Sequence, residues 1–193
     1  MDKKTDHRYK AWAEDIKNSD SEAFDALFRE LYPRLIHFAC GYTHDKQTAS
    51  DLTQDAFIAL WQNRRNINPD DSIKAYLYMT VRNKALNYLR NHGNKTVRLE
   101  SIQKTELAEK SSVNININLK SDEEAQKLAG LFKDWIQQLP QRQQEAFSLS
   151  RFEGFDHEEI AEIMEVSKNT VNNHITTALT FLKDCYDEYK SNK

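Results

Sequence analysis

The sequence predicts an all-α protein of two small helical domains joined by a flexible linker, the second domain containing a helix-turn-helix. Two observations predict the helices: only 4 of the 193 residues are Gly and 3 are Pro, and apolar residues recur at helical spacing in both halves. The division is predicted because about thirty residues in the middle lack that spacing, and such a stretch usually tethers domains. We expect domains at 1–92 and 125–193 and a linker at 93–124.

Composition excludes several function classes. Charged residues make up 30% of the chain, no apolar run reaches the length that crosses a bilayer, and the first ten residues lack the apolar segment of a signal peptide. The two cysteines form no CxxC pair, which fits a reducing compartment. Since the sequence shows no nucleophile–base pair, phosphate loop or metal cluster, we expect a soluble, cytoplasmic protein that is not an enzyme. We expect no cofactor, metal or small-molecule substrate.

The first forty residues combine a polar start with a predicted helix. Residues 1–20 are polar, and we expect their start to be frayed. Ser19 or Asp20 can cap the helix that follows. Its apolar positions share one face: Phe24, Leu27, Phe28 and Leu31. Because Pro33 has no amide hydrogen, we expect it to kink or break this helix before a second segment, residues 35–42.

The next predicted helix, residues 46–64, is apolar on two sides. The first side holds four apolar residues: Leu52, Ala56, Ala59 and Leu60. The second side holds three: Phe57, Ile58 and Trp61. Acidic and amide residues lie beside the second side: Asp51, Gln54 and Asp55. The second side must also be buried, either by the protein's own domain or by a partner protein, for which an exposed Trp would be a suitable anchor.

Residues 63–72 have turn chemistry, and Asp71 or Ser72 can cap the helix that follows. The stretch 72–98 carries six basic residues and no acid. Its buried stripe is predicted from apolar residues four apart: Ile73, Leu77, Val81, Ala85 and Leu89, with Tyr88 beside them. The opposite face combines an aromatic ring, two amides and a guanidinium: Tyr76, Asn83, Asn87 and Arg90.

This opposite face suits single-stranded or locally opened nucleic acid. A ring can stack on a base, amides can bind base edges, and cations can meet phosphates. The preceding loop could hold an extruded base. The alternative is a solvated helix face on which charges cluster by chance.

In the second half, helices are predicted to resume at about Asp122. The first has an apolar stripe: Leu128, Leu131, Phe132, Trp135, Ile136 and Leu139. Pro140 can begin the next helix, which is expected to include residues 143–152. Before these helices, VNININ at residues 113–118 alternates like a strand. A lone strand has nothing to pair with, so we expect it to be extended or disordered.

Residues 156–182 have the spacing of a DNA-binding helix-turn-helix. Asp156 and Glu159 form a capping-box pattern, Glu165 lies in the turn, and Ser167 can cap the second helix. Five residues of that helix are predicted to be buried: Val171, Ile175, Ala178, Leu179 and Leu182. Its outward amides and hydroxyls can read base edges in the major groove: Asn169, Asn172, Asn173, Thr176, Thr177 and Thr180. An ordinary helical hairpin is the alternative.

Two features limit what this second domain can do. His157 and Glu158 begin like the zinc motif HExxH, but Ala161 stands in place of the second His, so no metal site is expected. Residues 121–193 carry eight Lys and Arg against fourteen Asp and Glu. Since phosphate contacts dominate DNA affinity, the domain should bind duplex DNA weakly without the N-terminal domain or a partner.

Three stretches, in this order, resemble the extracytoplasmic-function (ECF) sigma factors, the small two-domain subunits that start bacterial transcription. ASDLTQDAFIALW resembles the helix that docks on the clamp of core RNA polymerase. KAYLYMTVRNKALNYLR resembles the helix that melts and reads the minus-ten promoter element. LPQRQQEAFSL with the helix-turn-helix resembles the domain that reads the minus-thirty-five element. The resemblance covers about residues 20–92 and 125–185.

The resemblance implies a sigma factor that binds core RNA polymerase and promoter DNA and is silenced by an anti-sigma factor, which can be membrane-bound. It implies four polymerase contacts: Asp51, Gln54, Asp55 and Trp61. It implies that residues 64–72, with Tyr76 and Asn83, hold and read the opened strand. It implies that six residues face the upstream element, the first two on phosphates: Lys168, Thr170, Asn172, Asn173, Thr176 and Thr177.

The sequence also departs from the family pattern. Glu165 stands where the family often has Gly, and the helix after it is less basic than usual. The asparagine-rich linker suggests a Bacteroidetes-type member. Two alternatives stay open: a stand-alone helix-turn-helix regulator, which leaves the acid-free helix unexplained, and a sigma-like decoy that binds an anti-sigma factor. The decoy should lack minus-ten readers, yet Tyr76, Asn83 and Arg90 are present.

Overall fold

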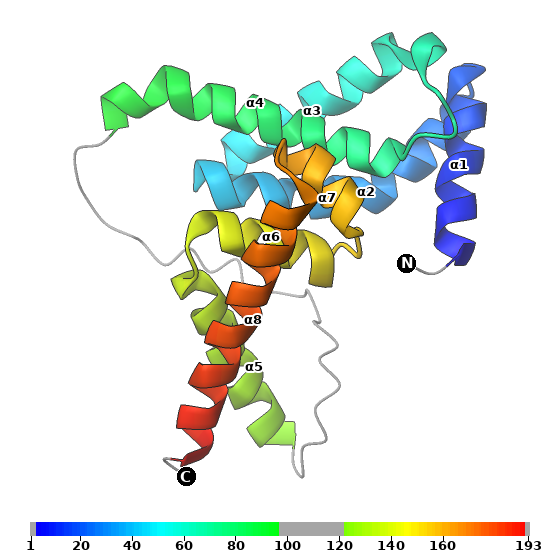
Figure 1. Ribbon diagram of the computed structural model, residues 1–193. Coiled ribbons are helices and arrows are strands. Elements are labelled where there is room, and N and C mark those ends of the chain that lie inside the picture. The colour runs from blue at the N-terminus through cyan, green and yellow to red at the C-terminus, as the bar shows by residue number, and fades with distance from the viewer. Residues whose placement is uncertain (1–2, 97–121, 192–193) are drawn as a thin grey trace. The chain divides into compact units, whose positions relative to one another are not determined.

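The computed structural model describes residues 3–96 and 122–191 (Figure 1). Two compact units divide the chain, one within residues 1–100 and one within residues 101–193. All regular elements in the described ranges are helices, which confirms the predicted all-α class. Most of the predicted linker, with its VNININ alternation, lies outside the described residues.

Four helices and a short 3-10 helix form the N-terminal unit. They are α1 (Lys3–Lys17), α2 (Ser21–Thr43), α3 (Lys46–Gln62), η1 (Arg64–Asn66) and α4 (Ile73–Thr96). Helices α2, α3 and α4 pack against one another, and α1 packs on α2. Eight large side chains of these helices are fully buried: Ile16, Leu27, Leu31, Leu35, Phe57, Leu60, Leu77 and Tyr78.

Helix α1 was not expected from the polar character of residues 1–20. Its Tyr9, Ala13 and Ile16 are buried, and Trp12 is half-buried. These residues are spaced at three and four positions, the period of a helix with one apolar face. The expectation of a frayed start is therefore wrong from Lys3 onward.

Helix α2 passes through Pro33 without a break, so the predicted division at this residue is wrong. Pro33 is exposed. The buried stripe continues on both sides of it through Leu27, Leu31, Leu35 and Ala39, each 0% exposed. Because tertiary packing of an apolar face supplies most helix stability, it outweighs the one hydrogen bond that proline removes. The predicted cap is confirmed at Asp20, whose carboxylate accepts two backbone N–H groups of the first turn.

Helix α4 extends to Thr96, past the predicted domain end at residue 92. Helix α5 begins at Asp122, where helices were predicted to resume.

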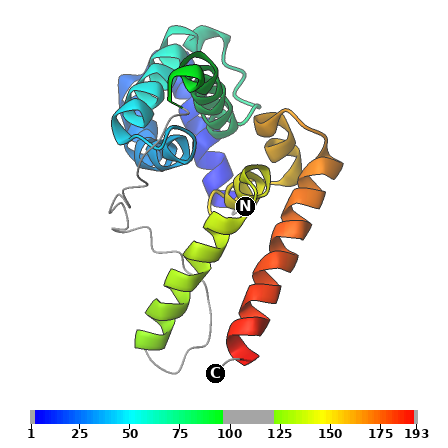
Figure 2. The same ribbon diagram turned by 90° about the vertical axis from the view of Figure 1, so that its left-hand side faces the viewer.

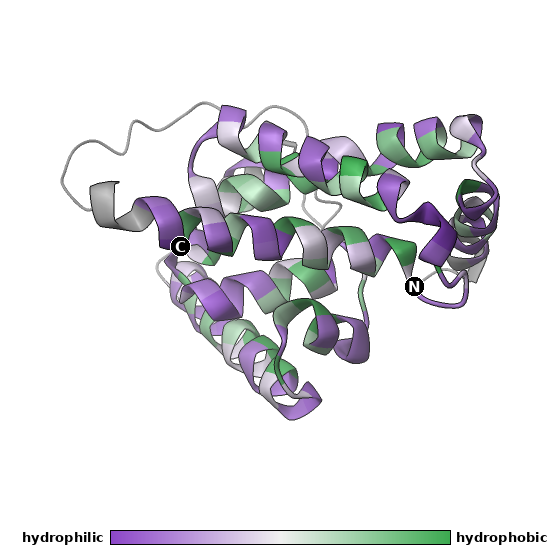
Figure 3. Ribbon diagram, turned by 90° about the horizontal axis from the view of Figure 1, so that it is seen from above, coloured by the Kyte–Doolittle hydropathy of each residue, from purple (hydrophilic) through white to green (hydrophobic). Residues whose placement is uncertain are grey.

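The C-terminal unit contains α5 (Asp122–Gln138), α6 (Gln141–Arg151), α7 (His157–Met164) and α8 (Lys168–Ser191). Helices α6 and α7 pack against α8. Helices α5 and α8 extend from α6 in the same general direction (Figure 2) and contact each other. Coloured by hydropathy, the helices show apolar and polar residues on different sides, as expected of elements with one buried face (Figure 3).

The predicted buried stripe of α8 is confirmed with one exception. Val171, Ile175, Ala178 and Leu182 are buried, but Leu179 is 40% exposed. The prediction of Leu179 as a core residue is therefore wrong. No helix within residues 3–96 and 122–191 is long and apolar enough to cross a bilayer.

Candidate nucleic-acid interfaces

Helix α4 presents the face that its sequence predicts. Ser72 caps the helix through a hydrogen bond from the backbone N–H of Ala75, at 3.2 Å. The predicted stripe is buried from Ile73 to Ala85. Four residues share an accessible face, the first two half-buried and the last two exposed: Tyr76, Asn83, Asn87 and Arg90. A phenol ring, two amides and a guanidinium are thus available along one side of the helix.

The cations of α4 are less available than the acid-free sequence suggests. Lys74 and Arg82 are only 3% and 2% exposed, and the Lys74 ammonium lies 5.8 Å from the centre of the Tyr78 ring. Lys84 forms a 3.5 Å ion pair with Asp55 of α3. The basic stretch is therefore partly used to hold the fold, while Arg90 is left exposed.

The loop before α4, residues 63–72, begins with the η1 turn, and Arg64 fixes it there. The Arg64 guanidinium lies 4.4 Å from the centre of the Trp61 ring. It donates to the Trp61 carbonyl at 2.7 Å and to Ser19 Oγ at 2.9 Å. The positive charge stands at the C-terminal end of α3, where the helix dipole favours it.

Helix α3 exposes three of its four predicted polymerase contacts: Asp51, Gln54 and Asp55. Trp61 is only half-buried rather than freely exposed, because its ring packs 5.0 Å from that of Phe24. Phe57 is 2% exposed, so its own domain buries this residue. The second apolar side of the helix is thus internal at Phe57 and partly covered at Trp61.

Ile58 is the apolar residue that α3 leaves exposed. Its side chain is 53% exposed, and it follows Gln54 and Asp55 by four and three positions, which places it on their face. The sequence pattern grouped Ile58 with Phe57 and Trp61, so its exposure could not be separated from theirs.

The helix-turn-helix forms with the predicted caps. Asp156 Oδ1 accepts the backbone N–H groups of Glu158 and Glu159, at 2.8 and 2.9 Å, and Glu159 Oε2 accepts the Asp156 N–H at 3.0 Å. Ser167 Oγ accepts the Thr170 N–H at 3.1 Å. These bonds satisfy backbone donors that a helix start leaves unpaired.

The turn between α7 and α8 uses a residue without glycine's freedom. Glu165 has φ 55° and ψ 47°, in the left-handed region. A side chain disfavours this conformation by about 1–2 kcal/mol. Glu165 thus adopts a conformation that Gly favours, and the departure from Gly places strain at this residue.

Helix α8 presents its predicted outward face. Six amide and hydroxyl residues are exposed: Asn169, Asn172, Asn173, Thr176, Thr177 and Thr180. Thr170 is half-buried, and its hydroxyl lies 2.8 Å from that of Ser167. Lys168 is bound to Glu158 of α7, and the hydrogen bond and charge of Glu158 raise the pKa of Lys168. Lys168 is therefore charged and paired with an acid of the neighbouring helix.

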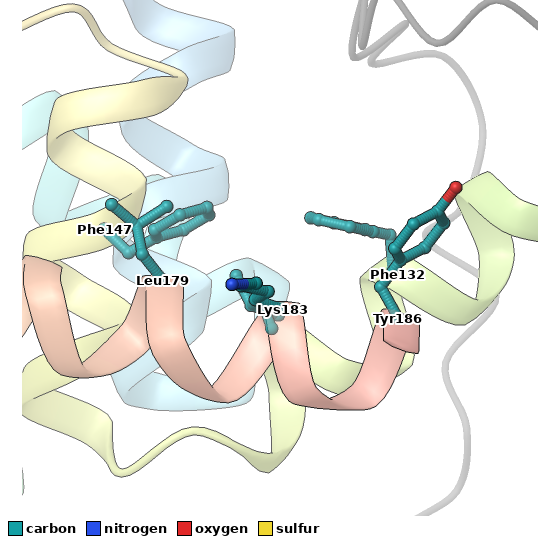
Figure 4. Close-up of a pocket in the computed structure, with 6 residues that line it drawn as sticks. Phe132, Phe147, Leu179, Lys183 and Tyr186 are labelled. Carbon is teal, nitrogen blue, oxygen red and sulfur yellow. The ribbon is translucent and has the colours of Figure 1, made fainter. Parts of the chain in front are cut away.

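An apolar pocket of about 240 Å³ lies among α5, α6 and α8 (Figure 4). Six residues line it: Phe132, Phe147, Leu179, Leu182, Lys183 and Tyr186. The exposure of Leu179 follows from this opening. The stripes of α5 and α8 do not predict the pocket, because helical periodicity does not show how closely two helices pack.

The fold and these surfaces define a two-domain DNA-binding protein, with an aromatic and amide face in one domain and a helix-turn-helix in the other. Comparison with known families agrees in both domains. The family description Sigma-70 region 2 matches residues 27–95, and Sigma-70, region 4 matches residues 131–182. Together the two matches span more than half of the chain.

Curated relatives match nearly the whole chain. The RNA polymerase sigma-H factor of Pseudomonas aeruginosa is 29% identical over 169 residues, 86% of each chain. The ECF RNA polymerase sigma-E factor of Haemophilus influenzae is 24% identical over 178 residues, 90% of this chain and 93% of the relative. The chain belongs to the sigma-70 family and is a sigma factor of the ECF type, which directs transcription initiation.

Solved structures share the fold. CnrH, in complex with the cytosolic domain of CnrY, superposes with a TM-score of 0.62 at 19% identity, over 94% of this chain and 98% of that one. The sigma factor RpoE from Bartonella quintana, in complex with the anti-sigma factor NepR, superposes with a TM-score of 0.59 at 23% identity, over 85% of this chain and 96% of that one.

Proposed function

We propose that the N-terminal domain binds core RNA polymerase and captures the opened minus-ten strand, and that the C-terminal domain reads the minus-thirty-five duplex. The working assignment is 1–92 for the first, 93–124 for the linker and 125–193 for the second. The observation that carries this proposal is the accessible face of α4, directly after the loop held by Arg64, within the region-2 match.

Strand capture is assigned to that face. Separating a base from its stack costs a few kcal/mol, and stacking on an aromatic ring returns about 1–3 kcal/mol per base. Tyr76 supplies the ring, Asn83 and Asn87 can bind base edges, and Arg90 can meet a phosphate. The loop before α4 would hold the extruded base.

Polymerase docking is assigned to α3. Asp51, Gln54 and Asp55 supply a polar, acidic surface that is exposed, and Ile58, one turn after Gln54 and Asp55, adds an exposed apolar contact. Trp61 shapes this surface from a half-buried position, since it packs on Phe24 and under Arg64.

Upstream recognition is assigned to α8. Asn172 and Asn173 can bind base edges, Thr176 and Thr177 can contact bases or thymine methyls, and Lys168 and Thr170 would lie near phosphates. Because Lys168 is paired with Glu158 and the domain around it is acidic, α8 alone should bind duplex DNA weakly. Tethering to polymerase raises the effective concentration of the promoter, so neither domain needs tight binding by itself.

The partners follow from this assignment. The related sigma factor RpoE was solved with an anti-sigma factor, and we propose an anti-sigma factor, membrane-bound in a Bacteroidetes-type setting, for this protein. The apolar pocket with exposed Leu179 offers it a contact surface. Like its family, the protein would act in the cytoplasm by binding alone, without catalysis, cofactor or small-molecule substrate.

The test is transcription by a reconstituted holoenzyme. The purified full chain is added to core RNA polymerase and a pool of random promoters, and the transcripts are sequenced. Initiation at one recurrent two-part promoter is expected. Core binding without initiation would favour a decoy, and tight duplex binding without core binding would favour a stand-alone regulator.

A further inference from the structure

We propose that α1 and the turn after it set the conformation of the α3–α4 loop, residues 63–72, and thereby position the residues that hold the opened strand. This inference rests on the proposed strand-capture role of the loop and α4. It gives a role to a segment that lies before the residues matched to sigma-70 region 2. Contacts at both ends of the loop carry the argument.

The first contact is made at the start of the loop, through Arg64. Its Nε donates to Ser19 Oγ, at 2.9 Å. The Ser19 backbone is fixed in the left-handed region, at φ 68°, and its N–H bonds the Ile16 carbonyl at 2.9 Å. The hydroxyl that receives Arg64 is therefore placed by the end of α1. Because a guanidinium is planar, its simultaneous contact with Trp61 leaves it a single orientation.

The second contact is made near the end of the loop, from α1 itself. Lys10 Nζ lies 2.5 Å from Asp70 Oδ1, and the hydrogen bond from Lys10 lowers the pKa of Asp70. The two side chains are 49% and 74% exposed. Exposed pairs add little to folding stability, so changing this one tests the position of the loop rather than the integrity of the fold.

Helix α1 can hold the loop because it is itself fixed to α2. Tyr9 is 4% exposed, and its hydroxyl donates to Glu30 at 2.7 Å. Burial and this hydrogen bond raise the pKa of Tyr9, so the hydroxyl stays protonated. Arg8 also pairs with Glu30 and lies 4.9 Å from the centre of the Trp12 ring. These contacts make α1 a rigid support.

The consequence for function concerns strand capture alone. Helix α4 begins directly after the loop, with Tyr76 in its first turn. A loop held at both ends loses less conformational freedom when it binds a base. Releasing either end should therefore slow promoter opening. Binding to core polymerase should not change in the Lys10 and Asp70 variants, since it is assigned to the exposed face of α3 and to Trp61, which Arg64 covers at the other end of the loop.

The experiment exchanges the charges of the Lys10–Asp70 pair in the full chain. Holoenzyme is assembled with core polymerase and a promoter selected as described above, labelled with 2-aminopurine at the extruded base. Lys10→Glu and Asp70→Lys should each slow opening about two- to fivefold, and the double variant should restore it. Ser19→Ala should slow opening about two- to tenfold. Lys17→Glu, on the same helix, is the charge control and should open like the wild type.

The outcomes separate the two proposals. If the wild-type holoenzyme opens no promoter, the proposed function is wrong and this inference fails with it. If the wild type opens the promoter and the three single variants match it, only this inference is overturned. Slow single variants without rescue in the double variant would also overturn it, because Lys10 and Asp70 would then act separately.

A second measurement needs no promoter. Amide hydrogen exchange of the free protein should be faster at residues 63–72 in Lys10→Glu and in Ser19→Ala, and unchanged in Lys17→Glu. Unaltered exchange in the loop of both variants would overturn the inference even if opening were slower.

Discussion

Helices α4 and α8 are both assigned to the promoter, yet their surroundings differ. Helix α4 is covered by three other helices: Leu77, Tyr78, Val81 and Ala85 are 0% exposed, and two of its cations are buried as well. Helix α8 is buried along one stripe only, and most of its surface is accessible.

This difference matches the state of the DNA that each helix is proposed to meet. An opened strand is flexible, so the protein must supply the fixed geometry, and a deeply packed helix after a supported loop does so. A duplex brings its own rigid groove, and a helix held on one side is sufficient to enter it. Chemistry differs in parallel, with a ring and a guanidinium on α4, and amides and hydroxyls on α8.

The largest effect is expected from Tyr76→Ala. Losing one base stack costs about 1–3 kcal/mol, or roughly five- to 150-fold in promoter opening. The rate of 2-aminopurine fluorescence change in the holoenzyme measures it. Tyr76→Phe keeps the ring and should open nearly like the wild type. If Tyr76→Ala opened normally, the strand-capture assignment of α4 would be wrong.

A smaller and sequence-dependent effect is expected from Asn172→Ala with Asn173→Ala. A good amide-to-base contact contributes about 1–3 kcal/mol of discrimination, so initiation on the selected promoter should fall about tenfold. On a promoter whose upstream element has been scrambled, the variant and the wild type should be equal. A loss that persists on the scrambled promoter would show that these amides do not read sequence.

The N-caps of α7 and α4 should contribute different amounts to the free energy of unfolding of their domains. Asp156 makes a reciprocal capping box at the start of α7, whereas Ser72 Oγ accepts the backbone N–H of Ala75 at the start of α4. Asp156→Ala should lower the free energy of unfolding of the C-terminal domain by about 1–2 kcal/mol, and Ser72→Ala that of the N-terminal domain by about 0.5–1 kcal/mol.

Hydrogen exchange resolved by domain measures both caps, since each domain opens with its own free energy. Glu162→Ala, on an exposed position of α7, is the control for Asp156. Equal losses from the two caps would contradict the ranking. Loss in the domain that was not altered would show that the two units do not unfold separately.

The sequence predicts best where a local pattern also determines the outcome. The caps at Asp20, Ser72 and Asp156 are confirmed, because a cap depends on residues two or three positions away. Tertiary packing decides the failures. Pro33 is tolerated because the residues before and after it on one face of α2 are buried. Leu179 is exposed because it lines the open pocket between helices of the C-terminal unit.

In the candidate sites, too, local patterns are predicted from the sequence and tertiary contacts are not. The spacing of Tyr76, Asn83, Asn87 and Arg90 predicts their shared face, since a helix converts spacing directly into direction. Spacing does not predict that Lys74 and Arg82 are buried or that Lys168 is paired, because these outcomes depend on neighbours from other helices or distant turns. Helix α1 is not predicted, because polar residues surround its short apolar stripe.

The smallest effect is expected from Glu158→Gln, which would release Lys168 on the α8 side of the comparison. Lys168 stays protonated at neutral pH with or without Glu158, since its ordinary pKa already lies near 10.5. If the freed ammonium reaches a phosphate, the slope of log affinity against log salt steepens by about 0.9, and low-salt promoter affinity rises a few-fold. Glu162→Gln removes the same charge from α7 without touching the pair, so its effect on the slope should be smaller. Equal slopes for the two variants would mean that the domain attracts DNA weakly because of its overall acidity and not because Lys168 is paired.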